Sequence, residues 1–286
     1  MPNYAGQLPR LSDISSHYQG ILSDVWGVVH NGISAHPDAV DALVEYRRSG
    51  GHVVLITNAA RTTPPIRQML DDMNVPREAY DAIITSGDVT RDHVAKYKGQ
   101  VIHYVGPATD HPIFDGLGVI EGSAKDAQAV VVTGLDDPAQ TPDDYVERID
   151  LWLELGLPMI CANPDKVVEI GDTLVYCAGS IADIYAQRGG TVMLAGKPYE
   201  PIYQAANKAL EEAVGHKVPA SKILAIGDSV RTDATGAAKY GMDLLFITGS
   251  IHAEEIDAFG DTDPTAVRDL VAPSGANLVG FQSRLE

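Results

Sequence analysis

Cysteines, basic residues and long apolar runs are all scarce in this sequence of 286 residues. Its 2 cysteines, Cys161 and Cys177, are too few for a disulfide framework or a four-thiolate metal site, and they fit a reducing compartment such as the cytoplasm. No apolar run approaches the length needed to cross a bilayer, and the N-terminus has no basic segment followed by an apolar one. We therefore expect a soluble, cytoplasmic protein without a secretory signal.

Positive charge is scarce relative to negative charge. The chain has 21 lysines and arginines against 39 aspartates and glutamates, so its formal net charge is −18. Surfaces that bind nucleic acids or anionic membranes need clustered basic side chains to displace counterions. We expect neither of these partners, and an anionic small molecule would have to be attracted by a local cation.

Strand-like and helix-like segments alternate along the chain, which is typical of an α/β protein. Short runs that are apolar throughout, such as residues 53–56, predict strands of a parallel sheet with helices on both faces. Between the first two such runs, Pro37 is expected to open a helix that ends at Gly50-Gly51. The fold class is therefore a Rossmann-like, three-layer α/β core with a doubly wound parallel sheet.

The middle of the chain carries its own complete set of elements. We interpret residues 98–190 as a second α/β domain inserted into the first, whose two parts are residues 1–97 and 191–286. A strand expected over residues 191–195 is thereby assigned to the first domain. The elements expected in the insertion are strands at 101–105, 129–133 and 159–162, helices at 142–155 and 180–188, and a hairpin turning at Gly171-Asp172.

Four polar clusters each follow a short apolar run. Because parallel sheets bind ligands beyond the carboxyl ends of their strands, we expect these clusters to converge. They supply carboxylates, an ammonium, a hydroxyl and an amide, which can hold a divalent cation beside an anionic group while one carboxylate attacks it. The clusters are Asp24, the pair Thr57-Asn58, Lys197, and Asp228 with Asp233.

The ordered set of motifs resembles the haloacid dehalogenase superfamily, specifically the subfamily IIA or NagD-like phosphatases, which act on nucleotide, sugar, glycerol and pyridoxal phosphates. The likeness runs from about Ile21 to about Gly249. Each motif is weak by itself, but their order and spacing together are specific. The motifs are Asp24 to Val28 followed by Gly32, Thr57-Asn58, Asn163-Pro164-Asp165, Gly196-Lys197-Pro198, and Gly227-Asp228 with Arg231, Thr232 and Asp233.

The resemblance implies a Mg²⁺-dependent phosphatase whose inserted domain is a cap of type C2. Asp24 is expected to be the nucleophile and to form an aspartyl-phosphate. Asp24, Asp228 and the backbone carbonyl of Trp26 are expected to hold the ion, with Asp233 acting nearby or through water. The substrate is expected to be a small phosphorylated metabolite, and caps of this type often mediate homodimers in related proteins.

The remaining motif residues are expected to bind substrate. Lys197 would offset the crowded carboxylates and contact the phosphoryl oxygens, and Thr57 and Asn58 would donate hydrogen bonds to the same oxygens. Asn163 and Asp165 would lie on the substrate loop of the cap. Asn-Pro and Pro-Asp are also ordinary turn formers, so a purely structural role for this motif remains open.

One position departs from the family pattern. Phosphatases of this superfamily carry an aspartate two residues after the nucleophile, which protonates the leaving alcohol, whereas this chain has Trp26. Three explanations remain open: another group such as His30 or a cap residue replaces the acid, the leaving group needs little help, as in an acyl phosphate or a phenolic ester, or the chain no longer hydrolyses phosphate esters. His30, His36 and Arg61 are otherwise expected to be surface or capping residues.

The third explanation has two forms. The protein is then a phosphometabolite-binding protein with a decayed site, or a metal-independent haloacid dehalogenase. Dehalogenases carry an aromatic residue at the position of Trp26, because a departing halide needs no proton. The retention of Asp228 and Asp233 counts against dehalogenation, since those enzymes need no metal.

Overall fold

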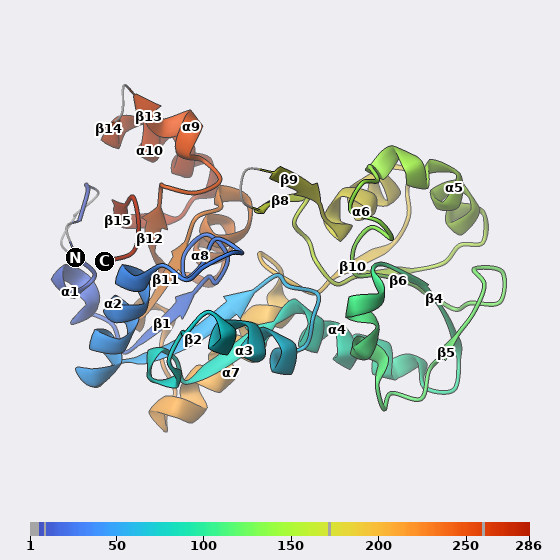
Figure 1. The fold of residues 1–286 in the computed structure, drawn as a ribbon, viewed down its shortest axis with the longest axis horizontal. Coiled ribbons are helices and arrows are strands. Elements are labelled where there is room, and N and C mark those ends of the chain that lie inside the picture. The colour runs from blue at the N-terminus through green and yellow to red at the C-terminus, as the bar shows by residue number, and fades with distance from the viewer. Residues whose placement is uncertain (1–5, 9, 171–172, 259–260) are drawn as a thin grey trace. The chain divides into compact units, whose positions relative to one another are not determined.

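The computed structural model describes residues 6–8, 10–170, 173–258 and 261–286. The chain divides into two compact units, and each unit is built from separate stretches of sequence (Figure 1). The first unit comprises Met1–Thr57, Arg67–Ile84 and Tyr203–Glu286, and the second comprises Asn58–Ile66 and Thr85–Ile202.

The first unit contains a six-stranded sheet in the order β15-β12-β11-β1-β2-β3. The pairings that join β15, β12, β11, β1 and β2 are all parallel. Strands β2 and β3 lie on one side of β1, and β11, β12 and β15 lie on the other. The sheet is therefore doubly wound, and its switch point lies between β1 and β11. The strands are β1 (Gly20–Ser23), β2 (His52–Thr57), β3 (Ala82–Thr85), β11 (Ile223–Gly227), β12 (Asp243–Ile247) and β15 (Asn277–Gln282).

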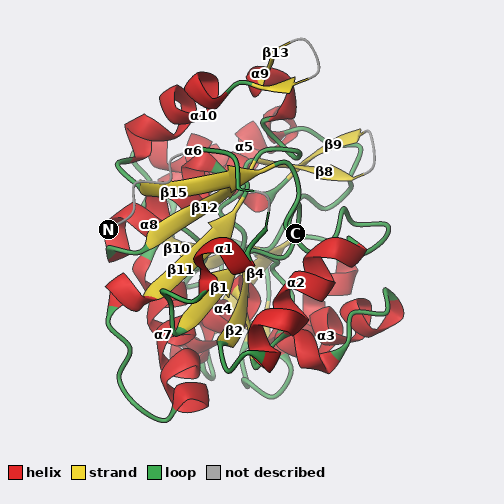
Figure 2. Cartoon of the chain, turned by 90° about the vertical axis from the view of Figure 1, so that its left-hand side faces the viewer, coloured by secondary structure: helices red, strands yellow, loops and turns green. Residues whose placement is uncertain are grey.

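Helices flank this sheet, as Figure 2 shows. Residues Val40, Leu43 and Val44 are buried on one face of α2, whose bounds Pro37–Arg48 confirm the helix expected from the sequence. A Cβ at Gly20 would lie 2.5 Å from a methyl carbon of Leu210, so the missing side chain lets α7 pack directly on β1. The helices are α1 (Ser12–Ser15), α2, α3 (Thr63–Asp72), α7 (Glu200–Val214), α8 (Thr235–Tyr240), α9 (Ala253–Ile256) and α10 (Pro264–Val271).

The second unit contains a five-stranded sheet in the order β10-β7-β6-β4-β5. A hairpin of β8 (Val167–Ile170) and β9 (Thr173–Tyr176) forms a separate antiparallel pair, and its expected turn at residues 171–172 lies outside the described residues. The other elements are β4 (Val101–Val105), β5 (Ile120–Glu121), β6 (Val130–Val132), β7 (Met159–Cys161), β10 (Val192–Leu194), α4 (Ser86–Val94), α5 (Val146–Glu154) and α6 (Ala178–Gln187).

The core of the second unit is centred on Trp152 of α5, whose side chain is fully buried. Its ring centroid lies 6.4 Å from that of Tyr185 on α6, in an edge-to-face arrangement. The hydroxyl of Tyr185 donates to the backbone oxygen of Leu157, which ties the end of α6 to the approach to β7. Aromatic packing therefore holds α5 and α6 together.

One expected strand belongs to a different sheet. The sequence assigned residues 191–195 to the first domain, but β10 pairs in parallel with β7 at the edge of the five-stranded sheet. The strand is only partly buried, which fits an edge position that local apolar content does not reveal. The two compact units begin and end at residues other than 98 and 190. The domain boundaries at 98 and 190 stay a prediction.

Two smaller features complete the fold. Strands β13 (Asp257–Ala258) and β14 (Asp261–Thr262) pair antiparallel. Within the residues that the structure describes, every helix falls short of the length and apolar character that a membrane crossing needs.

Replacing Trp152 by alanine is expected to lower the free energy of unfolding of the second unit by about 3–5 kcal/mol, because the fully buried ring leaves a cavity. Urea unfolding followed by far-ultraviolet circular dichroism measures this loss. Leu155→Ala is the control, since Leu155 follows α5 and is exposed. Equal unfolding midpoints for the two variants would contradict a core centred on Trp152.

Candidate active site

The first unit gathers three of the predicted carboxylates. Asp24 directly follows β1 and Asp228 directly follows β11, and these two strands are parallel neighbours. Asp233 lies on the helical turn Val230–Ala234 that comes next. One ligand oxygen from each of the three lies within 4.8 Å of the others, and all three side chains are at most 7% exposed.

Backbone contacts hold two of these carboxylates in place. Asp24 Oδ1 accepts a hydrogen bond from the amide of Val25 at 2.7 Å, and the Asp24 amide donates to the carbonyl of Ile226 at 2.8 Å. The second bond ties the residue after β1 to β11. Asp233 Oδ2 accepts from the amide of Ser229 at 3.2 Å, so the loop after β11 closes on itself.

Two glycines make room for the carboxylates. A Cβ at Gly27 would lie 2.1 Å from Asp228 Oδ2, and a Cβ at Gly227 would lie 2.2 Å from Asp233 Cγ. Gly27 also has φ +85°, a conformation that other residues adopt only with strain. Any side chain at either position would push a carboxylate out of the group.

The charge of this group fits a divalent cation. Three carboxylates that are buried within 4.8 Å of one another repel strongly unless a positive charge lies among them. Clustered carboxylate oxygens are the ligands that Mg²⁺ prefers, with water filling the other positions. Asp24, Asp228 and Asp233 are therefore the residues that could hold the ion.

Trp26 packs into its own loop. Its ring meets that of His30 edge-on at 5.0 Å between centroids, and a Cβ at Gly32 would lie 2.5 Å from Trp26 Cζ2. The amide of Gly27 donates to the carbonyl of His30 at 2.8 Å, which closes the loop beneath the ring. The indole thus serves as the packing centre of the segment that follows the nucleophile candidate.

His30 is not the surface or capping residue expected from the sequence. It is 0% exposed, and the ring of Trp26 lies against its ring. Burial, with a smaller contribution from the charge of His36, lowers the pKa of His30 to about 4. Its Nδ1 accepts from the amide of Gly32 at 2.9 Å, so at neutral pH the ring is uncharged and poorly suited to replace the missing acid.

His36 and Arg61 are a capping residue and a surface residue. Burial and the charge of Arg284 lower the pKa of His36, which precedes α2 as its N-cap residue. Arg61 is exposed and its Nε donates to Asp110 Oδ1 at 3.0 Å. Both outcomes agree with the expectation that these residues are capping or surface residues.

The second unit gathers the other predicted residues around Asn58. Its Oδ1 accepts from the backbone amide of Lys197 at 2.6 Å. Its Nδ2 donates to the carbonyl of Lys197 at 3.2 Å and to Asp165 Oδ1 at 3.0 Å. The side chains of Asn58 and Lys197 are 4% and 2% exposed. Thr57, which is 6% exposed at the end of β2, belongs to the first unit.

The Asn163-Pro164-Asp165 motif forms a turn in the structure. Asn163 Oδ1 accepts from the amide of Asp165 at 3.0 Å, and Cys161 donates to the carbonyl of Asn163. The amide of Gly179, in the first turn of α6, donates to the carbonyl of Asp165 at 3.1 Å. The turn-forming role that the sequence left open is therefore real, while substrate contact by Asn163 and Asp165 stays a prediction.

Two residues near the carboxylates were missed by sequence reasoning. Ser250 Oγ and Asp228 Oδ2 would both touch a Cβ at Gly27, at 2.6 and 2.1 Å. His252 Nε2 lies 3.5 Å from the amide of Val230 and accepts a weak hydrogen bond from it. Both residues follow β12, so the rule that placed Asp24 and Asp228 beyond strand ends could have found them.

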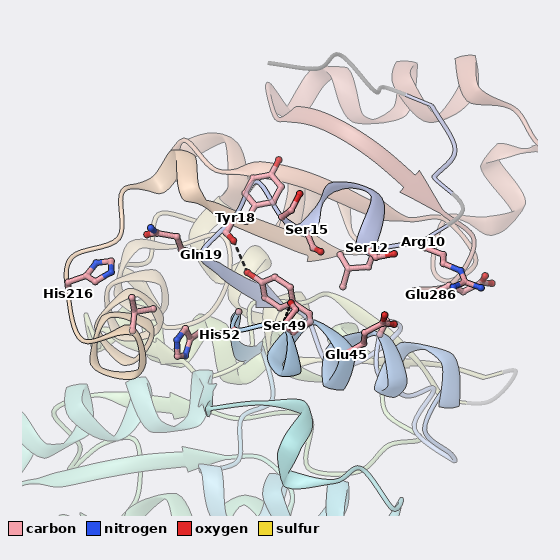
Figure 3. Close-up of a pocket in the computed structure, with 17 residues that line it drawn as sticks. Arg10, Ser12, Ser15, Tyr18, Gln19, Glu45, Ser49, His52, His216 and Glu286 are labelled. Carbon is pink, nitrogen blue, oxygen red and sulfur yellow. Dashed lines mark hydrogen bonds between the residues drawn. The ribbon is translucent and has the colours of Figure 1, made fainter.

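A cavity of about 690 Å³ lies at the amino ends of strands in the first sheet (Figure 3). Tyr18, Gln19 and His52 line it, and they lie at or just before the amino ends of β1 and β2. The hydroxyl of Tyr46 donates to the carbonyl of Tyr18 at 3.1 Å across its wall. Because the strands are parallel, this cavity is separate from the carboxylates at their carboxyl ends.

Comparisons with known proteins agree with these motifs. A family model described as haloacid dehalogenase-like hydrolase matches residues 21–120, and a second, described as HAD-hydrolase-like, matches residues 194–273. Both matched stretches contain carboxylates of the group, with Asp24 in the first and Asp228 and Asp233 in the second.

Three relatives illustrate the likeness. The 5′-nucleotidase YutF of Bacillus subtilis is 23% identical over 252 residues, which are 83% of this chain and 90% of that protein. A glycerol phosphate phosphatase from Mycobacterium tuberculosis, solved in complex with magnesium, is 20% identical with a TM-score of 0.65, covering 88% of this chain and 78% of that one; it supports the fold alone.

The third relative is a hydrolase of the haloacid dehalogenase-like family from Brucella suis 1330, known from a crystal structure. It is 41% identical, with a TM-score of 0.86, and the match covers 98% of this chain and 100% of that chain. Identity of this extent, together with the two family models and the carboxylates that they contain, shows that this chain belongs to the haloacid dehalogenase-like hydrolases.

Proposed function

We propose that the protein is a Mg²⁺-dependent phosphatase that hydrolyses a small phosphorylated metabolite through an aspartyl-phosphate. The observation that carries this proposal is the group of three buried carboxylates, which fits a cation. Asp24 is one of the three, so a bound cation would lie beside the proposed nucleophile. The name of one relative points the same way, since it is a 5′-nucleotidase. The substrates of such an enzyme are phosphate monoesters.

In the proposed reaction, Asp24 is the nucleophile. Its carboxylate forms a bond to phosphorus while the bond from phosphorus to the alcohol oxygen breaks, and water then hydrolyses the aspartyl-phosphate to release inorganic phosphate. The ion, when bound, neutralises negative charge so that two anions can approach. Asp228, Asp233 and the carbonyl of Trp26 are proposed to hold it, and the hydrogen bond from the Val25 amide orients Asp24.

Thr57 and Lys197 are proposed to contact the phosphoryl oxygens. Thr57 is the last residue of β2, which is the parallel neighbour of β1. It therefore lies at the carboxyl ends of the strands, as Asp24 does. Thr57 is also bonded covalently to Asn58, the residue whose side chain binds the backbone of Lys197. A buried ammonium is well suited to a phosphoryl group, because it supplies positive charge where water is scarce.

The packing of Trp26 favours a second candidate function. The ring fills the loop against His30 and Gly32 and has no proton of suitable acidity for a leaving alkoxide. A protein with this site could bind a phosphorylated metabolite without rapid turnover. A substrate whose leaving group needs little protonation, such as an acyl phosphate or a phenolic ester, would reconcile the ring with fast hydrolysis.

Dehalogenation is the weakest alternative. The buried carboxylates suit a reaction that uses a metal, and a metal-free dehalogenase would gain nothing from them.

A homodimer formed through the second unit and a cytoplasmic location both remain predictions.

Asp24→Asn is expected to lower phosphate release by at least about 10³-fold, because the amide cannot form the covalent intermediate. Release of inorganic phosphate from a panel of phosphate monoesters with Mg²⁺ measures the effect. Asp41→Asn, an exposed change on α2, is the control and should retain activity. Equal activity with a chelator present would rule out the metal mechanism.

Gly27→Ala is expected to abolish the rise in melting temperature that Mg²⁺ causes in the wild type, because the new Cβ would displace Asp228. Gly50→Ala is a matched control: Gly50 has φ +95° and open space around it, so only backbone strain of about 1–2 kcal/mol applies. Thermal unfolding with and without Mg²⁺ separates strain from displacement. A Mg²⁺ response in Gly27→Ala as large as that of Gly50→Ala would count against the proposed ion site.

Trp26→Asp tests the missing acid. If protonation of the leaving group limits the wild type, the variant is expected to turn over an alkyl phosphate roughly 10²-fold faster than Trp26→Asn, which removes the same ring without adding an acid. Steady-state kinetics on an alkyl and a phenolic phosphate provide the comparison. Equal rates for the two variants, together with a fast wild type, would indicate that another group supplies the proton.

A further inference from the structure

The hydrogen bonds of Asn58 leave it little capacity for a substrate. A carboxamide has two N–H donors and one carbonyl oxygen. One donor is directed at the carbonyl of Lys197 and the other at Asp165 Oδ1, while the oxygen accepts from the amide of Lys197. With the side chain 4% exposed, both hydrogens are already used inside the second unit.

The two bonds to Lys197 form a clamp on its backbone. Asn58 binds the N–H and the C=O of the same residue, so the peptide units on both sides of the Lys197 Cα are held. The direction in which a side chain leaves the backbone depends on these two peptide units. The clamp therefore sets where the Lys197 side chain begins and which way it points.

The surrounding chain is shaped to admit this clamp. A Cβ at Gly196 would lie 2.3 Å from Asn58 Oδ1 and 2.7 Å from Pro164 Cδ, so only glycine allows the amide to reach the backbone. The third bond, to Asp165, is charge-assisted, and it fixes which end of the amide carries the hydrogens. Asp165 is itself held by Asn163 and Gly179.

We infer that Asn58 is a positioning residue that fixes Lys197, and that Asp165 orients Asn58, so neither residue contacts the phosphoryl group. This inference rests on the proposed function for the role of Lys197 as the phosphate-binding cation. It reassigns two residues whose sequence motifs suggested substrate contact. The Asn163-Pro164-Asp165 turn then contributes to catalysis from a distance, through Asn58 and the Lys197 backbone.

The experiment exchanges the amide and the carboxylate. Asn58→Asp places a carboxylate opposite Asp165 and removes both donors. Combining it with Asp165→Asn restores a donor and an acceptor across the contact with residue 165, but not the bond to the carbonyl of Lys197. We expect Asn58→Asp and Asn58→Ala to lower kcat roughly 10–100-fold with KM changed less than about threefold, as for other residues that orient a catalytic group. We expect the double variant to recover only part of the lost kcat, at least about threefold over Asn58→Asp, because the contact with residue 165 returns while the carbonyl of Lys197 stays without its donor.

A direct phosphate ligand would behave differently. Its loss would raise KM at least as strongly as it lowers kcat, and Asp165→Asn would not rescue Asn58→Asp. Either result would overturn the inference. Kinetics are measured well below the melting temperature of each variant, so that lower stability alone does not reduce kcat.

A chemical readout tests the clamp independently of phosphatase activity. Lys197 is 2% exposed, so an amine-reactive acylating reagent should modify it slowly in the wild-type chain, as measured by mass spectrometry of its peptide. We expect Asn58→Ala to raise that rate about tenfold, because the released backbone opens locally more often. An unchanged rate would overturn the inference. A wild type that releases no phosphate from any monoester would instead count against the proposed function, while the acylation result would still decide the clamp.

Discussion

Mutual repulsion of three buried carboxylates is the constraint on which the active end of the first unit depends. Asp24, Asp228 and Asp233 lie too close together, and too far from water, to be stable as three unscreened charges. The fold nevertheless builds this group from two adjacent parallel strands and opens space for it with Gly27 and Gly227. A positive charge among the three carboxylates would relieve this repulsion, and their oxygens are of the kind that divalent cations prefer.

Each unit, taken by itself, holds charged side chains in place. In the first, acidic oxygens gather at the carboxyl ends of β1 and β11. In the second, a buried amide binds the backbone of the buried Lys197. In both cases hydrogen bonds from neighbouring groups hold the charged residue: the amide of Val25 binds the Asp24 carboxylate, and the side chain of Asn58 binds the backbone of Lys197. Preorganisation of this kind keeps charged groups in place before a substrate arrives.

Trp26 distinguishes this site from the phosphatases that its motifs resemble. The ring takes the position of an acid and becomes the packing centre of the loop against His30. The same burial lowers the pKa of His30 to about 4, so the change removes one acid and disfavours the nearest substitute. The few residues that follow Asp24 are therefore used for packing, and no strong acid is found among Trp26 and His30.

Much of the fold followed from local pattern. Apolar runs marked the strands of the first sheet, Pro37 and Gly50 marked the ends of α2, and the residues after the strands marked Asp24 and Asp228. These features are readable because they depend on neighbours in sequence: periodic burial, restricted backbone angles and the order of elements in a parallel sheet. The order and spacing of the motifs also indicated the family.

Other features required the tertiary structure. Four features depend on residues that are distant in sequence or on the path of a loop. They are the sheet to which β10 belongs, the burial of His30, the approach of Ser250 to the carboxylates and the hydrogen bonds of Asn58. An amide side chain has the same donors and acceptor wherever it lies, so its composition predicts that it will bind something. Which partner it binds, a phosphoryl oxygen or the backbone of Lys197, is decided by the distances that folding creates.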